Sequence, residues 1–269
     1  MRKHPAPIST ALSHREARPR RRTQSALTAF ATLGLLATLG LLAGCAAQPA
    51  ATDEQIAPTN MASDGILITS EGPTLAPANT GDPIPTEPAD ATGAATIVLY
   101  ADYACPACAA FELTNAEQIA TWIAAGDATL EIHPLTFLDR VSADSRYSSR
   151  AANAVAAVAS YAPEHYLAVS TALFEQQPSE GVAGHTNDEL LAIIEDAGVD
   201  PSLIADAVED ERFSDWTFAA TERAFTGPIP NADITVIDST PTVIVNGTTY
   251  TGGITSPDEF AEFVASVSD

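Results

Sequence analysis

The spacing of hydrophobic positions changes twice between residue 94 and the C-terminus. Residues 95–100 form a continuous apolar run rich in β-branched side chains, which is typical of a strand buried on both faces. Helical spacing follows over residues 106–125, with a break or kink expected near Thr114-Asn115. Alternating positions over residues 128–138, interrupted by Pro134, predict a second strand. This part of the chain therefore predicts the order strand, helix, strand.

The middle of the region shows helical spacing only. Two predicted helices have clear start signals, because Thr186-Asn187-Asp188-Glu189 is a capping-box pattern and Asp200-Pro201 places a cap residue before a proline. The predicted helices cover residues 151–161, 163–174, 190–197, 203–208 and 213–225. Together they predict a helical insertion at about residues 142–226.

The C-terminal part returns to strand patterns. Residues 242–245 are apolar and β-branched, Asn246-Gly247 is a strong hairpin signal, and residues 248–250 complete the pair. Ser256-Pro257-Asp258-Glu259 then caps a last helix. The order βαβ, helical insertion, ββα predicts an α/β domain over residues 94–269.

Residues 1–44 have the pattern of an export signal, in which Arg20-Arg21-Arg22 precedes an uncharged apolar run over residues 26–44. The run ends in Leu42-Ala43-Gly44-Cys45, which resembles the lipobox of bacterial lipoproteins, where the cysteine thiol receives a diacylglycerol. An uncleaved anchor is the alternative, because the run is nearly long enough to span a bilayer. Both interpretations place the rest of the chain outside the cytoplasm and tethered to the membrane.

Residues 45–93 are rich in Ala, Thr, Pro, Asp and Glu, and their seven prolines interrupt every helical or strand period. We predict a disordered linker over this range, with a root-mean-square span of about 40 Å if it behaves as a flexible coil. Such a linker would let an anchored domain meet partners at a distance from the membrane.

Charge is distributed unevenly along the 269 residues, whose formal net charge is −23. Residues 1–44 hold seven of the 12 basic residues and one of the 35 acidic ones, which leaves five arginines, no lysine and a net charge of −29 from Cys45 onward. Nucleic-acid binding is excluded, because phosphate contacts need clustered Lys and Arg. We attribute the acidity to solubility or salt adaptation.

Two cysteines remain once Cys45 is assigned to lipid, and they form the motif Cys105-Pro106-Ala107-Cys108 between a buried strand and a helix. Unpaired N–H groups and the helix dipole at a helix N-terminus favour a thiolate, so Cys105 is a candidate nucleophile. The spacing keeps the sulfur of Cys108 close enough for a disulfide. Cys108 could therefore resolve a mixed disulfide formed by Cys105.

Two other interpretations of the motif are weaker. A structural disulfide is common in exported proteins, but a bridge that closes a four-residue loop removes little entropy from the unfolded chain. A zinc site would need a second cysteine pair or paired histidines, and His133, His165 and His185 lie far apart in the sequence. We expect no metal.

The motif and three further segments resemble a known family, the exported DsbA-like proteins of thioredoxin fold, which include many membrane-anchored thiol-disulfide oxidoreductases. The resemblance covers most of residues 94–269. The segments are residues 100–108 (YADYACPAC), like that family's strand and active-site motif, residues 239–247 (STPTVIVNG), like its cis-proline loop and following strand, and residues 150–154 (RAANA) and 173–178 (LFEQQP), like its helical insertion.

The resemblance implies a thioredoxin fold with a helical insertion and a protein disulfide oxidoreductase. Cys105 would be the nucleophile and Cys108 the resolving cysteine, with Pro106 and Ala107 between them as modulators of their reactivity. Ala107 stands where strongly oxidising DsbA proteins carry histidine, so one source of thiolate stabilisation is missing. No cofactor beyond a Cys105–Cys108 disulfide is implied.

The resemblance also gives Thr240-Pro241 a role as the substrate-binding platform. Their peptide bond would be cis and would face the cysteines, with the Thr240 backbone free to pair with a substrate strand. Leu99 stands where thioredoxins keep a buried carboxylate. Asp102 is the nearest carboxylate in sequence and is either a solvated loop acid or a group that tunes Cys105. His133 is expected to be a packed or surface residue rather than a proton shuttle.

The implied partners are reduced or misoxidised exported proteins and a membrane quinone reductase of the DsbB or VKOR type that regenerates the disulfide. The family and the compartment favour the oxidative direction. The alternatives are a reductase or isomerase that draws electrons from a membrane thiol carrier, and a thioredoxin-fold binding or chaperone module whose disulfide is inert.

Overall fold

The computed structural model describes residues 56–87, 93–141 and 145–268, so the predicted signal and Cys45 lie outside the described residues. A mixed sheet runs through this part of the chain, with the strand order β2-β1-β4-β3-β5-β6. The strands are β1 (Ile66–Thr69), β2 (Gly72–Pro73), β3 (Ala95–Ala101), β4 (Ala128–Pro134), β5 (Thr242–Val245) and β6 (Thr248–Thr249).

The central three strands have the predicted order. β3 pairs in parallel with β4, with Ile97 opposite Leu130, and β5 pairs antiparallel with the other side of β3, with Leu99 opposite Val243. β4 ends at Pro134, four residues earlier than expected. Beyond it the chain turns into a 3₁₀ segment, because proline has no N–H to continue the ladder.

Helices account for most of the remaining described residues. They are α1 (Pro106–Ala125), α2 (Tyr147–Tyr161), α3 (Tyr166–Glu175), α4 (Asn187–Asp196), α5 (Ala205–Glu209), α6 (Ser214–Thr226) and α7 (Pro257–Val267). Short 3₁₀ segments cover Phe137–Val141, Pro163–His165 and Pro201–Leu203. None of the helices in the described residues is long and apolar enough to cross a bilayer.

The break expected near Thr114-Asn115 is wrong, because α1 is one continuous helix. Asn115 is fully buried, and its side-chain amide donates 2.9 Å to the carbonyl oxygen of Phe111, one turn earlier. The asparagine thus satisfies its amide within the helix instead of interrupting it. α1 ends at Gly126, whose φ of 76° is the left-handed conformation typical of a helix C-cap.

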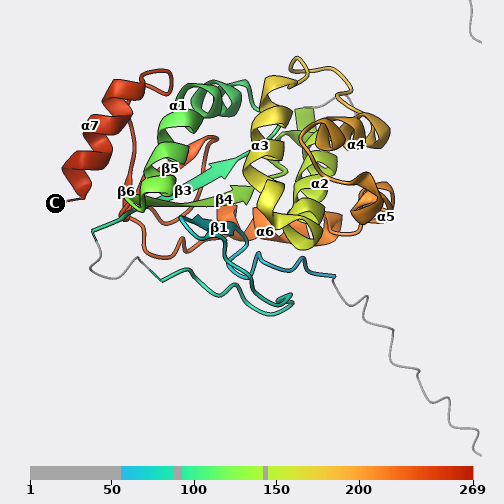
Figure 1. The fold of residues 1–269 in the computed structure, drawn as a ribbon, viewed down its shortest axis with the longest axis horizontal. Coiled ribbons are helices and arrows are strands. Elements are labelled where there is room, and N and C mark those ends of the chain that lie inside the picture. The colour runs from blue at the N-terminus through green and yellow to red at the C-terminus, as the bar shows by residue number, and fades with distance from the viewer. Residues whose placement is uncertain (1–55, 88–92, 142–144, 269) are drawn as a thin grey trace, which may run out of the picture. The chain divides into compact units, whose positions relative to one another are not determined.

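α1 and α7 lie together beside the sheet, and the helices of the insertion gather next to α1 (Figure 1). A large apolar core joins the sheet, α1 and the insertion, and includes the fully buried Phe111, Val155 and Phe260. A smaller cluster joins Tyr100 and Ile244 of the sheet to Ala224 of α6 and to Ile229 and Ile237. The thioredoxin fold with a helical insertion is therefore confirmed in the described residues.

The linker prediction is wrong for residues 56–87, which we call the N-terminal arm. Within the arm, β1 pairs antiparallel with the free edge of β4, with Ile66 opposite Ile132 and Ile68 opposite Leu130. Prolines are compatible with an edge strand and its turns, and Pro73 lies in β2 at the edge of the sheet. Proline density therefore gave a misleading signal.

The arm is fixed by buried side chains and by polar contacts with the insertion. Ile66 and Met61 are at most 1% exposed. Arg223 of α6 binds Asp64 through two hydrogen bonds of 2.7 and 2.8 Å, and the side-chain amide of Asn60 donates 2.8 Å to the carbonyl oxygen of Ala159 in α2. The folded part of the chain thus begins well before residue 94.

Candidate active site

The cysteine motif lies where β3 passes into α1. Cys105 is the N-cap residue of α1, with φ −86° and ψ 115°, and Pro106 occupies the first helical turn, where its missing N–H has no cost. The backbone N–H of Cys108 donates 3.0 Å to the Cys105 carbonyl. Cys105 is 7% exposed and Cys108 is 1% exposed, and both are free thiols. Both cysteines are buried, and the candidate nucleophile, Cys105, is the more exposed of the two.

The loop before β5 lies against this motif, although Thr240 and Cys105 are 135 residues apart in the sequence. Thr240–Pro241 is a cis peptide bond, as predicted, and the thiol of Cys105 donates a 3.3 Å hydrogen bond to the Thr240 carbonyl oxygen. Both loop residues are half-buried. The residues expected to form the redox pair and its platform therefore meet at one place.

The two thiols have opposite electrostatic surroundings. The pKa of Cys105 is lowered from 9.0 to about 6, chiefly by the hydrogen bond with Cys108; burial opposes this effect, and the N–H groups of Ala107 and Cys108 add to it. Burial, followed by the neighbouring Cys105 sulfur, raises the pKa of Cys108 well above its usual value. At neutral pH the pair therefore holds one thiolate, on Cys105, and one thiol, on Cys108.

This difference predicts a pH profile for alkylation of the reduced protein, measured in a Cys45→Ser background so that only two thiols remain. Iodoacetamide reacts with the thiolate, so the rate at Cys105 should rise with pH and level off above about pH 7, with a midpoint near pH 6. Cys108 should stay unmodified throughout this range. A midpoint near about 8.5, the ordinary cysteine value, would contradict the assignment.

Asp102 is fully buried, so the interpretation of it as a solvated loop acid is wrong. Its carboxylate accepts hydrogen bonds from the backbone N–H groups of Ala104 and Leu138, both at 2.8 Å, and from the Ser148 hydroxyl at 2.7 Å. Burial raises its pKa from 3.8 to about 6, against these hydrogen bonds. Asp102 therefore joins the active-site loop to the start of α2.

Two other polar side chains near the motif were not predicted. The Gln177 amide donates hydrogen bonds to backbone carbonyls of the active-site loop.

Glu112 lies in α1, one turn after Cys108, and is 3% exposed. It accepts a 3.3 Å hydrogen bond from Thr171, and burial raises its pKa from 4.5 to about 7. Glu112 lies at a groove of about 710 Å³ bounded by α1, α3 and α4. The only signal in the sequence that could have indicated Glu112 is its spacing, because residues four apart in a helix share a face and Glu112 follows Cys108 by four residues.

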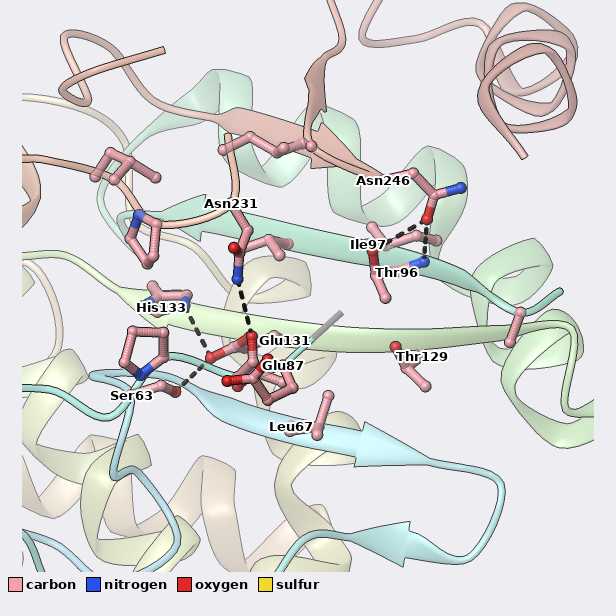
Figure 2. A pocket seen from close by; sticks show the side chains of 18 of the residues that line it. Ser63, Leu67, Glu87, Thr96, Ile97, Thr129, Glu131, His133, Asn231 and Asn246 are labelled. Carbon is pink, nitrogen blue, oxygen red and sulfur yellow. Dashed lines mark hydrogen bonds and ion pairs between the residues drawn. The ribbon is translucent and has the colours of Figure 1, made fainter. Parts of the chain in front are cut away.

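His133 is packed, as expected, and it belongs to a different cavity. It stacks on Tyr100, with 4.3 Å between ring centroids, and its Nε2 atom lies 3.2 Å from the Glu131 carboxyl group. Figure 2 shows this pair beside Ser63 of the arm, whose hydroxyl donates to Glu131, in a pocket of about 370 Å³. Neither cysteine lines this pocket, and its polar contacts hold the arm against the sheet.

Leu99 is a core residue, 2% exposed. In the described ranges, no three His, Cys, Asp or Glu side chains are grouped as metal ligands.

This arrangement defines a thioredoxin-fold protein with a dithiol at the start of the first helix. The chain matches the family model described as thioredoxin over residues 90–266, and it belongs to that family.

Solved structures share this fold. The reduced form of the disulfide bond oxidoreductase DsbG from Mycobacterium tuberculosis is similar with a TM-score of 0.57 and 24% identity, over 77% of this chain and 88% of that chain. DsbA from the same organism gives 0.56 and 24%, over 76% and 92%. BdbD from Bacillus subtilis gives 0.56 and 19%, over 79% and 96%. The resemblance to DsbA-like proteins thus holds at the level of the fold.

A curated relative matches over part of its length. The serine/threonine-protein kinase PknE of Mycobacterium tuberculosis is 33% identical over 114 residues, which is 41% of this chain and 20% of that protein. The chain therefore spans about a fifth of the length of the curated relatives it matches.

Proposed function

We propose that the protein is an extracytoplasmic thiol-disulfide oxidoreductase that oxidises cysteines of exported proteins. The observation that carries the proposal is Cys105 at the N-terminus of α1, with its pKa lowered to about 6, beside the buried Cys108 thiol. A sulfur with a lowered pKa beside a second thiol is the arrangement that disulfide exchange requires.

The proposed reaction begins with the Cys105–Cys108 disulfide. A substrate thiolate attacks the Cys105 sulfur, the S–S bond of the pair breaks, and Cys108 leaves and takes up a proton. A second substrate thiolate then attacks the substrate sulfur of the mixed disulfide and releases Cys105 as a thiolate. The substrate loses two electrons, which the cysteine pair receives. The stabilised Cys105 thiolate is a good leaving group, and this favours oxidation of the substrate.

Under this proposal Thr240 and Pro241 form the substrate platform. The Thr240 backbone pairs with an extended substrate segment, and the Pro241 ring lies against the sulfurs. The half-buried surface of the two residues and the 3.3 Å contact of Thr240 with Cys105 support this role. Cys45, outside the described residues, carries the lipid anchor, and a DsbB- or VKOR-type membrane reductase restores the disulfide.

The direct test is transfer of oxidising equivalents. The oxidised protein, in a Cys45→Ser background, is mixed with a reduced unfolded polypeptide that carries two cysteines. We expect one substrate disulfide to form for each Cys105–Cys108 disulfide lost, as counted by mass spectrometry after acid quenching. Retention of the disulfide in the protein and of both thiols in the substrate would instead support an inert binding module.

The direction is tested by the reduction potential, measured against glutathione redox buffers. We expect a value less negative than about −200 mV, in the range of oxidising members of this class. Ala107 stands where strong oxidants carry a histidine, so one group that would stabilise the Cys105 thiolate is missing. A reductase or isomerase is therefore the second candidate. A potential near about −270 mV, that of thioredoxin, would favour that candidate.

A further inference from the structure

A side chain of the helical insertion holds the backbone of the active-site loop. Gln177 lies just after the end of α3 and is half-buried. Its side-chain nitrogen Nε2 donates two hydrogen bonds, one of 2.8 Å to the Tyr103 carbonyl and one of 3.0 Å to the Cys105 carbonyl. One amide therefore fixes two carbonyls of the loop, one of which belongs to the nucleophile.

The Cys105 carbonyl has a special place in this loop, because it also starts α1. It accepts hydrogen bonds from the N–H groups of Cys108 at 3.0 Å and Ala109 at 3.1 Å. Its orientation sets how the first turn of α1, with the N–H groups of Ala107 and Cys108, is directed at the Cys105 sulfur. These N–H groups contribute to the low pKa of that sulfur. A group that fixes the carbonyl thus acts on the thiolate.

Helix α3, which ends just before Gln177, also holds the side chain of Tyr103. The Tyr103 ring stacks on Phe174 of α3, with 4.7 Å between centroids, and its hydroxyl forms a 3.0 Å hydrogen bond with Ser170 of α3. Tyr103 is 1% exposed. The Asp102 carboxylate also accepts a hydrogen bond from the Ala104 N–H. Each residue of the loop from 102 to 105 therefore takes part in at least one hydrogen bond. α3 is therefore the main support of the loop from the insertion.

We propose that Gln177 is a positioning residue that sets the reactivity of the Cys105 sulfur by fixing the carbonyls of Tyr103 and Cys105. The inference rests on the proposed function of this site and extends it, because it gives the helical insertion a part in the redox chemistry. Gln177 touches neither the sulfurs nor the substrate platform in the contacts described, so it acts through the loop backbone.

The test uses Gln177→Leu, which keeps the volume of the side chain and removes both donors. Alkylation of reduced Cys105 is measured against pH in the full chain with Cys45→Ser. We expect the midpoint to move upward and the rate at pH 6 to fall about threefold to tenfold, the effect of losing one or two hydrogen bonds. The reduction potential should become more negative, because the reduced thiolate loses stabilisation.

The matched control is Gln176→Leu. Gln176 is the exposed neighbour, and it accepts a hydrogen bond from His185 through its backbone carbonyl, which the substitution keeps. This control should leave the midpoint and the potential unchanged. Gln177→Glu is the second variant, because its carboxylate would face two carbonyls and should move the midpoint further upward. It also serves as the test if Gln177→Leu does not fold.

An unchanged pH profile and potential in a folded Gln177 variant would overturn this inference while leaving the proposed function intact. A failure of the proposed function gives a different result, namely an ordinary cysteine midpoint or no disulfide transfer in the protein with Gln177 unchanged. The urea unfolding curve of each variant separates a local effect on Cys105 from a general loss of stability.

Discussion

A protein that carries Cys105→Ala is expected to transfer no disulfide to a reduced substrate, so that oxidation falls to the rate of buffer alone. The reason is that the remaining thiol cannot take over. Cys108 is 1% exposed, and burial keeps its pKa well above the usual range, so it is neither accessible nor ionised at neutral pH. The measurement is the initial rate of oxidation of a reduced two-cysteine polypeptide.

The matched variant is Cys108→Ala, which keeps the nucleophile and removes the resolving thiol. Mixed with glutathione disulfide, it should accumulate one glutathione on Cys105, because no second thiol displaces it. Cys105→Ala should take up none. Mass spectrometry in the Cys45→Ser background distinguishes the two products. Equal labelling of both variants would mean that the roles of the two cysteines are not distinct.

Cys108→Ala should also weaken the nucleophile. The hydrogen bond from Cys108 is the largest contribution to the lowered pKa of Cys105. Its removal is therefore expected to move the alkylation midpoint of Cys105 upward from about pH 6. This result would show that the two sulfurs act as a pair.

The second large effect is expected far from the cysteines, at Ile66 of the N-terminal arm. Ile66 is fully buried, and it packs in the main core from β1. Ile66→Ala removes buried apolar groups and leaves a cavity, so the free energy of unfolding should fall by about 2–5 kcal/mol. Urea unfolding followed by tryptophan fluorescence or circular dichroism measures the change.

Leu67→Ala is the control for this prediction, because Leu67 is the next residue of β1 and is only half-buried. Its side chain lines the pocket of Figure 2, on the other face of the strand. We expect a loss of about 1 kcal/mol or less for this variant. A solvated linker would give no loss for either variant, and that outcome would refute the packing of the arm.

The order of elements after residue 94 could be read from the sequence, because it depends on short-range patterns. The apolar run at residues 95–100, the helical spacing after Cys105 and the Asn246-Gly247 turn each report on neighbours within a few positions. The candidate cysteines could be found for the same reason, since a thiol at a helix N-terminus is a local arrangement. The platform at Thr240-Pro241 needed the family resemblance as well.

The arm could not be predicted, because its stability comes from a distant partner. Three apolar residues and a threonine at 66–69 are too few to define a strand among prolines, and they become one only beside the free edge of β4. The ion pair between Asp64 and Arg223 joins residues 159 positions apart. Composition describes a segment by itself and carries no information about an unpaired strand elsewhere.

The sequence by itself thus determined the Cys105-Pro106-Ala107-Cys108 motif, the class of fold and the element at which these cysteines lie. Only the tertiary structure decided which groups surround the sulfurs. Asp102 became a buried link to α2, and Gln177 came to bind the Cys105 carbonyl from 72 residues away. The physical reason is that helices and strands follow from local spacing, whereas hydrogen-bond partners and burial depend on segments that meet only after the chain has folded.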